Sequence, residues 1–341
     1  MKKSATNLSR RAGLASLAAL ALAAGLIAHA PASAQQAHFT KPIRFIVPYP
    51  PGGPTDLTGR VYAEKLSTIL GTPVIVENKP GAQGVPAMQQ FLQIPADGHA
   101  IYFGTLSTQV VFPVISAYRK QALPYDARKD VVPVSLMGGS ALAFASSTKA
   151  NIGSFKELIA AAKANPGKLN FGSDGIGSLT HLGGEMLNQM AGMQTVHIPY
   201  KGTAEFTQAL ISGDIQYACS GIVGLSTLQK SGKAKVLAIA GEHRSDLFPD
   251  VPTTGELGYP GLDLTSWFGV FMKAGTSKPY VDAVAKAIVQ ASLEPEVIQR
   301  LSAAGVTMGM SGTPEQFQAR LDTDFKRWSG VVEKAAIKFE N

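Results

Sequence analysis

Cysteine is nearly absent from this chain of 341 residues. Cys219 is the only one, so neither an intrachain disulfide nor a cysteine-based metal site can form. The residues beside it, Tyr217, Ala218 and Ser220, are typical of a strand interior. A thiol in that position is expected to be buried and unreactive.

The motifs of common catalytic sites are also absent. The five histidines after residue 34 form no H-E-x-x-H pattern, and there is neither a G-x-S-x-G elbow nor a G-x-x-x-x-G-K-[ST] phosphate loop. No pair of carboxylates stands out, since Asp56 and Asp174 are read more simply as helix-start or turn residues. Catalytic groups can still assemble in space, so an enzyme is disfavoured but not excluded.

The chain has only a small excess of basic over acidic residues once the first 34 residues are set aside. The net charge is +7, but four basic residues and no acidic ones lie in that segment, which leaves +3 for the rest. The remaining charges are dispersed, and no basic run is interleaved with aromatics. Nucleic acid is therefore not expected as a partner.

The first 34 residues have the pattern of a secretory signal peptide. Basic residues within positions 2–11 precede an apolar run at 14–28, and Ala32-Ser33-Ala34 forms an A-x-A cleavage site. Arg10 and Arg11 lean towards a twin-arginine signal, and Sec export stays the alternative. No later stretch reaches the roughly 18 apolar residues of a membrane span. We therefore expect an exported protein that begins near Gln35.

The rest of the chain is organised around the stretch Pro48–Asp56, which reads PYPPGGPTD. The apolar run at 43–47 predicts a buried strand before it, and a helical pattern follows from Leu57 to about Leu70. Glycine lets the backbone approach a guest, and the helix start offers unpaired N–H groups and a positive dipole end. Such a loop suits a carboxylate. The alternative is a tight connection that binds nothing.

Strands and helices alternate along the chain, which predicts parallel sheets with crossover helices. Ligands of such sheets bind beyond the carboxyl ends of strands, where the loops at 49–56 and 105–107 fall. The second half repeats the pattern with a strand at 169–171, a Gly-rich loop at 172–178 and a helix at 179–190. Thr180 replaces the last glycine of G-x-G-x-x-G, so a dinucleotide is disfavoured. The β-prone runs at 131–147 and 260–270 are expected to pass between two domains.

Five segments in this order resemble the Bug family, the substrate-binding proteins of tripartite tricarboxylate transporters. They are KPIRFIVPYPPGGPTD at 41–56, VIVENKPGAQG at 74–84, GSDGIGSLTHL at 172–182, IPYKGTA at 198–204 and VPTTGELGYPGLDLTSWFGVFMKAGTSKP at 251–279. The resemblance implies an α/β fold of the two-lobed periplasmic binding protein type (type II-like), with two Rossmann-like lobes joined by two crossover strands. Lobe 1 would comprise 35–138 and 266–341, and lobe 2 would comprise 139–265.

The resemblance and the loop positions together imply a ligand site without a metal or a cofactor. Its expected residues in the first lobe are Tyr49, Gly52, Gly53, Pro54, Thr55, Asp56, Thr105 and Ser107. Those in the second lobe are Ser173, Gly177, Ser178, His181, Tyr200, Lys201, Gly202, Thr203 and Ser220. Backbone amides are expected to hold a carboxylate more than charged side chains do.

The chain departs from the family in one place. Many members end the strand at 217–221 with an aromatic-acidic pair, whereas this chain has small neutral residues there. An amino acid ligand is disfavoured by this change, because its ammonium would want a carboxylate. The change leaves room for a bulkier guest, unless the other lobe fills the space.

The leading functional hypothesis is a monomer that captures a small organic carboxylate, aliphatic or aromatic, in the periplasm. It would deliver this ligand to the membrane permease subunits of a tripartite tricarboxylate-type transporter. Two alternatives stay open. The same fold can present a ligand to a membrane histidine kinase, and a periplasmic α/β hydrolase would need a nucleophile and a base assembled in space.

Overall fold

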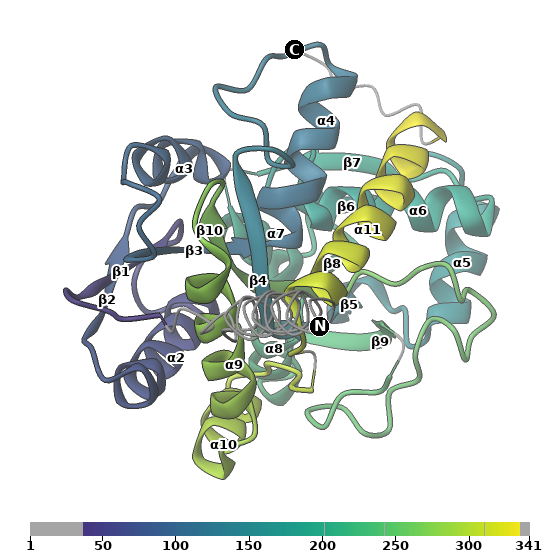
Figure 1. Cartoon of the computed structure of the whole chain (residues 1–341). Coiled ribbons are helices and arrows are strands. Elements are labelled where there is room, and N and C mark those ends of the chain that lie inside the picture. The colour runs from purple at the N-terminus through teal and green to yellow at the C-terminus, as the bar shows by residue number, and fades with distance from the viewer. Residues whose placement is uncertain (1–36, 201, 242, 310, 335–341) are drawn as a thin grey trace, which may run out of the picture. The chain divides into compact units, whose positions relative to one another are not determined.

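Two five-stranded sheets, each covered by helices, form the computed structural model (Figure 1). It describes residues 37–200, 202–241, 243–309 and 311–334. The predicted signal peptide and Lys201 lie outside the described residues. In the part of the chain that is described, no helix is both long and apolar enough to cross a membrane.

The first sheet joins the beginning of the described chain to a strand from its last third. Its order is β2 (Val74–Asn78), β1 (Ile43–Val47), β3 (Ala100–Thr105), β10 (Ser266–Lys273) and β4 (Val131–Ser140). The second sheet has the order β7 (Val196–Pro199), β6 (Asn170–Ser173), β8 (Tyr217–Gly221), β5 (Leu142–Ser147) and β9 (Ala234–Ala240).

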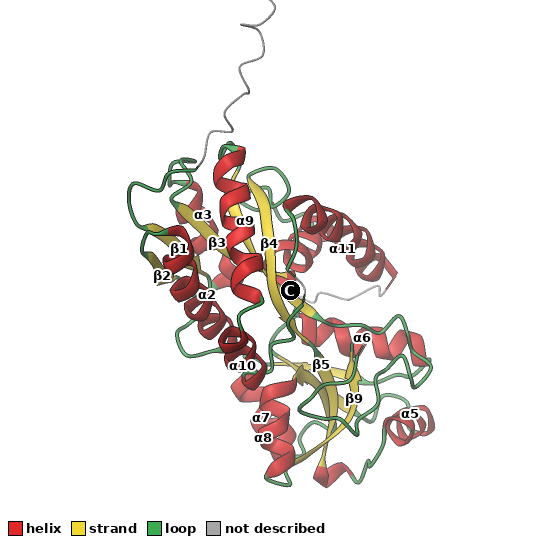
Figure 2. Cartoon of the chain, turned by 60° about the horizontal axis from the view of Figure 1, so that its bottom comes forward, coloured by secondary structure: helices red, strands yellow, loops and turns green. Residues whose placement is uncertain are grey.

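Both sheets are mixed, which corrects the expectation of parallel sheets. β10 runs antiparallel to both of its neighbours, and so does β5. The reason lies in the connections between the sheets. β4 ends at Ser140 and β5 begins at Leu142, so the chain passes directly from the first sheet into the second (Figure 2). β5 therefore starts at the edge where the parallel strands of its own sheet end. β10 enters the first sheet in the same way.

Helices cover the sheets on both faces. Those that follow strands of the first sheet are α2 (Pro54–Leu70), α3 (Val85–Leu92), α4 (Phe112–Tyr118), α9 (Lys278–Ser292), α10 (Pro295–Ala303) and α11 (Pro314–Lys334). Those of the second sheet are α5 (Phe155–Ala164), α6 (Leu179–Ala191), α7 (Thr203–Ser212) and α8 (Ile222–Lys230). Short helical turns lie at Ala82–Gly84, Ser107–Val111 and Thr148–Ala150.

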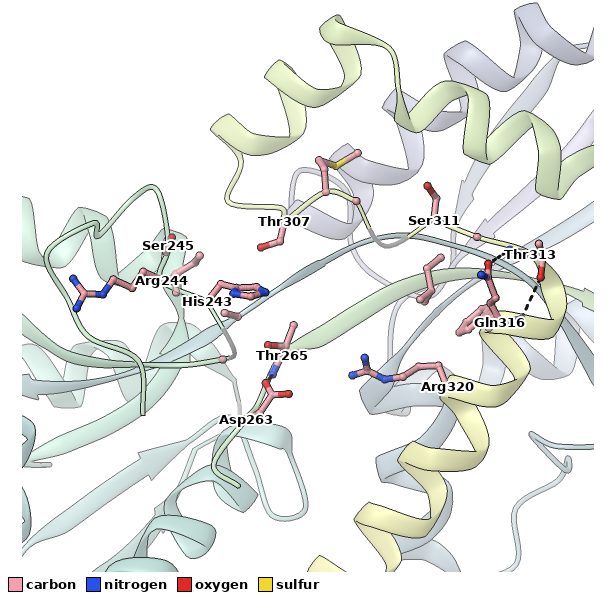
Figure 3. Close-up of a pocket in the computed structure, with 18 residues that line it drawn as sticks. His243, Arg244, Ser245, Asp263, Thr265, Thr307, Ser311, Thr313, Gln316 and Arg320 are labelled. Carbon is pink, nitrogen blue, oxygen red and sulfur yellow. Dashed lines mark hydrogen bonds between the residues drawn. The ribbon is translucent and has the colours of Figure 1, made fainter. Parts of the chain in front are cut away.

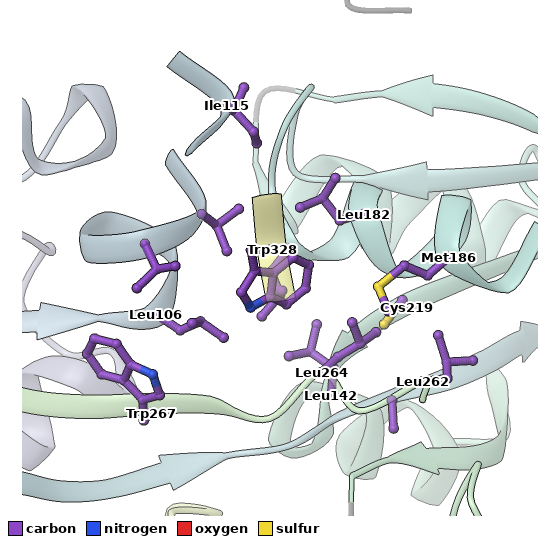
Figure 4. Close-up of a cluster of buried hydrophobic side chains, with 14 of the residues drawn as sticks. Leu106, Ile115, Leu142, Leu182, Met186, Cys219, Leu262, Leu264, Trp267 and Trp328 are labelled. Atoms are coloured by element: carbon purple, nitrogen blue, oxygen red, sulfur yellow. The ribbon is translucent and has the colours of Figure 1, made fainter. Parts of the chain in front are cut away.

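Helix α11 packs against residues from both halves of the fold. Its Trp328 is fully buried in one hydrophobic cluster with Leu106, which follows β3, and Leu182, which lies on α6 (Figure 4). The Trp267 indole N–H donates to Asp324 of α11 at 2.8 Å, and Arg320 Nε donates to the same carboxylate at 2.9 Å. Burial of the Trp267 and Trp328 side chains contributes several kcal/mol to the stability of the fold, at about 25 cal/mol per Å² of apolar surface removed from water.

The sequence signals of helix starts are confirmed where they are local. The Ser154 hydroxyl caps α5 by accepting from Glu157 N at 3.1 Å, as expected, whereas the Glu157 carboxylate accepts from Gly153 N at 2.7 Å, one residue before the N–H of a standard capping box. α2 begins three residues earlier than the expected Leu57, because Pro54 fits the first helical position, where no N–H is needed. The proposed lobe boundaries near residues 138 and 266 stay a prediction.

Candidate functional site

The carboxyl ends of the parallel strands in the two sheets face one another. In the first sheet β1, β2, β3 and β4 end at one edge, and the chain crosses from the end of β4 to the start of β5. In the second sheet β6, β7, β8 and β9 end at the edge where β5 starts. The loops that follow these strands therefore meet between the sheets, the position in which such folds bind ligands.

The first loop, residues 48–56, leads into a helix end that no side chain caps. Gly53 is the N-cap residue of α2, and its φ of −83° is an ordinary value that other residues also adopt. A Cβ placed on Gly53 would meet nothing within 4 Å. The N–H groups in the first turn of α2 and its positive dipole end therefore border open space, as an anion site requires.

Asp56 belongs to this loop but is fully engaged within it. Its carboxylate accepts from Gly52 N at 2.9 Å, from Arg60 Nε at 3.0 Å and from Asn78 Nδ2 at 2.8 Å. Burial alone would raise the pKa of Asp56, but the bonds from Arg60, Gly52 and Asn78 together lower it. Asp56 is thus ionised, and its hydrogen bonds stabilise the loop.

Tyr49 joins this loop to the end of β3. Its hydroxyl lies 2.8 Å from Thr105 Oγ1, with either atom able to donate, and Thr105 Oγ1 also accepts from Thr108 N at 3.2 Å. Burial raises the pKa of Tyr49 to about 12, so it remains a neutral phenol. Ser107 is half-buried at the start of the turn 107–111.

The second loop, residues 173–178, is closed on itself by hydrogen bonds. The Ser178 hydroxyl accepts from His181 N at 3.2 Å, which caps α6, and it donates to Gly175 O at 2.7 Å. His181 Nδ1 accepts from Gly177 N at 3.0 Å. The Ser173 hydroxyl lies 2.7 Å from His197 Nε2. These groups hold the loop in shape, and few of them remain for a ligand.

His181 and His197 form a stacked pair beneath this loop. Their ring centroids are 3.8 Å apart, and Phe171 packs beside both. Burial lowers the pKa of His181 to about 3, with a further contribution from His197, and burial lowers the pKa of His197 to about 4. Both imidazoles are therefore neutral near pH 7. Glu185 Oε1 lies 3.9 Å from His181 Nε2, and burial raises the pKa of that carboxyl.

Two further helix ends of the second sheet lack side-chain caps. α7 begins after Gly202, which follows β7, and α8 begins after Gly221, which follows β8. Ser220 is buried at the end of β8, and Gly221 borders open space. Tyr200 is half-buried and Thr203 is exposed at the start of α7. Together with α2, these helices direct uncapped N-terminal ends towards the region between the sheets.

One interaction connects the loops of the two sheets directly. The negative charge of Asp174, next to the end of β6, raises the pKa of the Tyr49 phenol and of the buried Cys219 thiol, although burial is the larger cause in both. A charge acts in this way only at short range. Asp174 therefore lies near Tyr49 of the first loop and near Cys219 of β8.

The sequence analysis did not assign Asp174 to the site. It was read as a turn residue, and Thr180, which bonds it, was noted only as a missing glycine. The sequence feature that could have identified Asp174 is its position directly after Ser173, at the start of the Gly-rich loop between a predicted strand and a predicted helix. His197, 16 positions from His181 in sequence, could be paired with it only through the fold.

A second concave region lies apart from these loops. It is a cavity of about 520 Å³ lined mostly by loop residues and by the first turns of α11, among them Thr265, Thr307 and Arg320 (Figure 3). It includes none of the predicted site residues. Arg320 is held by Asp324, and Arg244 pairs with Glu256 at 3.0 Å. The described residues include no cluster of three or more histidine, cysteine or acidic side chains that could hold a metal ion.

The two mixed sheets with facing loops have the fold of periplasmic binding proteins, and the family match shows a non-enzymatic solute-binding protein of this class. Residues 58–337 match the family described as "Tripartite tricarboxylate transporter family receptor" (TctC). The chain belongs to this family, which confirms the resemblance to the Bug proteins. It is 33% identical over 300 residues to protein BugT of Bordetella pertussis, covering 88% of this chain and 91% of that one.

Solved structures agree with this assignment. A periplasmic transporter is similar with a TM-score of 0.77 and 34% identity, covering 89% of this chain and all of the other. Rpa4515 of Rhodopseudomonas palustris with adipate has a TM-score of 0.77 and 26% identity, covering 87% and 98% of the two chains. MatC of the same organism with bound malate has a TM-score of 0.72 and 27% identity, covering 86% and 100%.

Proposed function

We propose that this protein captures a small organic carboxylate in the periplasm and delivers it to the membrane permease of a tripartite tricarboxylate-type transporter. The observation that carries the proposal is the uncapped start of α2 beside Gly53, which borders open space where the two sheets face one another. A carboxylate oxygen at that position would accept hydrogen bonds from N–H groups that no side chain of the loop caps.

Two further observations support this assignment. Similar proteins have been solved with adipate and with malate, both dicarboxylates. The Tyr49 and Thr105 hydroxyls stand beside the same loop as neutral donors. The uncapped ends of α7 and α8 on the opposite side would receive a second polar or anionic group. We therefore favour a ligand with a carboxylate at one end and a second polar group at the other.

A thermal-shift screen of aliphatic and aromatic mono-, di- and tricarboxylates tests the proposal, with calorimetry on each hit. Binding to the folded state alone raises the melting temperature by mass action, so a true ligand gives a concentration-dependent shift. The fully methylated ester of each hit is the matched control, because it keeps the carbon skeleton and removes every carboxylate charge. Equal affinity for an acid and its ester would overturn the carboxylate assignment.

Delivery to a permease requires that loaded and empty protein differ in shape. The two sheets are connected by extended segments at β4–β5 and before β10, which can act as hinges. Small-angle scattering with saturating ligand should give a smaller radius of gyration than scattering without it. An unchanged radius, with binding established by calorimetry, would contradict closure of the two halves on the ligand.

A further inference from the structure

Asp174 is the acidic residue of the second loop, and its bonding differs from that of Asp56 in the first loop. The Thr180 hydroxyl donates to Asp174 Oδ1 at 2.5 Å, and Asp174 N donates to Thr180 Oγ1 at 3.2 Å. Among the described residues no donor reaches Asp174 Oδ2, and no basic side chain forms an ion pair with this carboxylate. Within the described part of the chain, one of its two oxygens therefore has no donor.

Asp174 lies at the edge of the second sheet where the candidate ligand region is expected. Asp174 directly follows Ser173, the last residue of β6, at the edge that faces the first sheet. It is half-buried, and its charge acts on Tyr49 of the opposite loop. Thr180 holds the Asp174 carboxylate in place, since the Thr180 hydroxyl is itself positioned 2.9 Å from the Ser178 hydroxyl that caps α6.

We propose that Asp174 determines ligand specificity by accepting a hydrogen bond from a hydroxyl or ammonium group on the carboxylate held between the sheets. The inference rests on the proposed function, because it needs a carboxylate bound at the α2 end of the site. A half-buried carboxylate with a single hydroxyl donor among the described residues disfavours a ligand that offers only more negative charge there. The preferred ligand is then a hydroxy or amino acid with a carboxylate at its far end.

Asp174 changes the expectation, drawn from the strand at 217–221, that an amino acid ligand is disfavoured. The small neutral residues of that strand disfavoured an amino acid, because they offer its ammonium no acidic partner. Asp174 stands at the end of β6, which pairs directly with β8. It places a carboxylate in the same region from the neighbouring strand. A ligand ammonium group and a ligand hydroxyl group would thus play the same role, since each can donate a hydrogen bond to Asp174.

The test compares ligands that differ in one substituent. Calorimetry at fixed salt would use three matched series: succinate, malate and aspartate; glutarate, 2-hydroxyglutarate and glutamate; adipate, 2-hydroxyadipate and 2-aminoadipate. Within the chain length that binds best, wild type should bind the hydroxy or amino member at least about tenfold more tightly than the unsubstituted acid, the value of a hydrogen bond to a charged group.

Two variants separate the two kinds of donor. Asp174→Asn keeps an acceptor oxygen and loses the charge, so an amino ligand should lose about 30-fold or more in affinity and a hydroxy ligand only a few-fold. Asp174→Leu removes both, so the preference for either donor should vanish. The unsubstituted acid should bind both variants as well as wild type or better, because a negative charge has been removed.

Asp250→Asn is the matched control, since Asp250 is exposed and lies outside the loops that contain the predicted site residues of either sheet. It makes the same change in net charge, and all affinities should stay within about twofold of wild type. Circular dichroism would establish that each variant is folded. If carboxylates bind but the Asp174 variants leave the substituent preference unchanged, this inference is overturned and the proposed function stands. If no carboxylate binds wild type, both are overturned.

Discussion

The loops after β1 and β6 share one order of parts, a strand, a Gly-rich turn and a helix start, yet their polar groups are used in opposite ways. In the first loop the acidic side chain, Asp56, is saturated by three donors, and the helix end has no side-chain cap. In the second loop the helix end is capped by Ser178, and the acidic side chain, Asp174, has one donor.

Because of this difference, we expect the two sides of the region between the sheets to attract opposite kinds of ligand group. The first loop presents N–H groups and would attract a carboxylate, whereas the second presents a carboxylate oxygen and would attract a donor. The same backbone motif thus gives opposite electrostatics, depending on whether the loop's own side chains satisfy the helix end or leave it to a guest.

The largest effect is expected from Gly53→Val, which would fill the open space at the uncapped end. Gly53 has an ordinary φ, so the fold should tolerate valine, but its side chain would occupy the position of a carboxylate. We expect a loss in affinity of roughly 100-fold or more, about 3 kcal/mol, for the best ligand of the screen, measured by calorimetry.

Gly330→Val is the control for this change. Gly330 lies on α11 and also borders open space, so the substitution should leave affinity unchanged. The melting temperatures of both variants should stay close to that of wild type. Normal affinity in Gly53→Val would show that the first loop is not the site.

The next effect concerns stability and compares the two acids directly. Asp56→Ala would leave Gly52 N–H and the Asn78 amide without their acceptor, and it should lower the free energy of unfolding by about 2–3 kcal/mol. Asp174→Ala loses one hydroxyl donor at a half-buried position and should cost less than about 1 kcal/mol. Urea denaturation measures both values, and equal losses would remove the proposed distinction between them.

A third effect tests the histidine pair that supports the second loop. The pKa values of His181 and His197 are lowered to about 3 and about 4, so these rings stay neutral in the folded state, while the unfolded chain takes up protons below about pH 6.5. Their contribution to stability is therefore complete above about pH 6.5 and is lost as the pH falls towards those lower values. We expect a fall of up to about 4 kcal/mol in the free energy of unfolding between about pH 7 and pH 5, about 2 kcal/mol from each ring.

Urea denaturation across this pH range would measure the fall, and the variant His181→Gln/His197→Gln should flatten the curve. Asp56 does not interfere, because its pKa is lowered and its own contribution is lost only at more acidic pH. A pH slope that is identical in wild type and in this variant would contradict the assignment to the pair.

Much of the fold could be predicted because its signals are local. The run at 43–47, the N-cap at Ser154 and the Gly-rich turns marked their elements within a few residues. Helices α4, α8 and α10 were missed, since they are only 7–9 residues long. The antiparallel direction of β5 and β10 depends on which sheet each strand joins, which is not a local property.

The site was harder to predict, because what a polar residue can do depends on its partners. Asp56 and Asp174 were given one interpretation, and the structure separates them by the three donors of the first and the single donor of the second. His181 was expected to face a ligand, yet its Nδ1 accepts from Gly177 N and its ring stacks on His197. The assignment of ligand-contacting residues itself stays a prediction.

The smallest effect is expected from Lys201→Met, at a position that lies outside the described residues. If the first loop holds the carboxylate through α2, a cation next to α7 should add little. A side chain that served as the main anchor would cost about 1.5–3 kcal/mol or more when replaced. We expect a loss at or below about 1.5 kcal/mol, roughly tenfold in affinity, for the best dicarboxylate at fixed salt. Lys163→Met, which removes the same charge from an exposed position on α5, is the control and should have no effect. A thousandfold loss confined to Lys201→Met would transfer the anchor to the second sheet, and the groups that the two sides of the region attract would then be reversed.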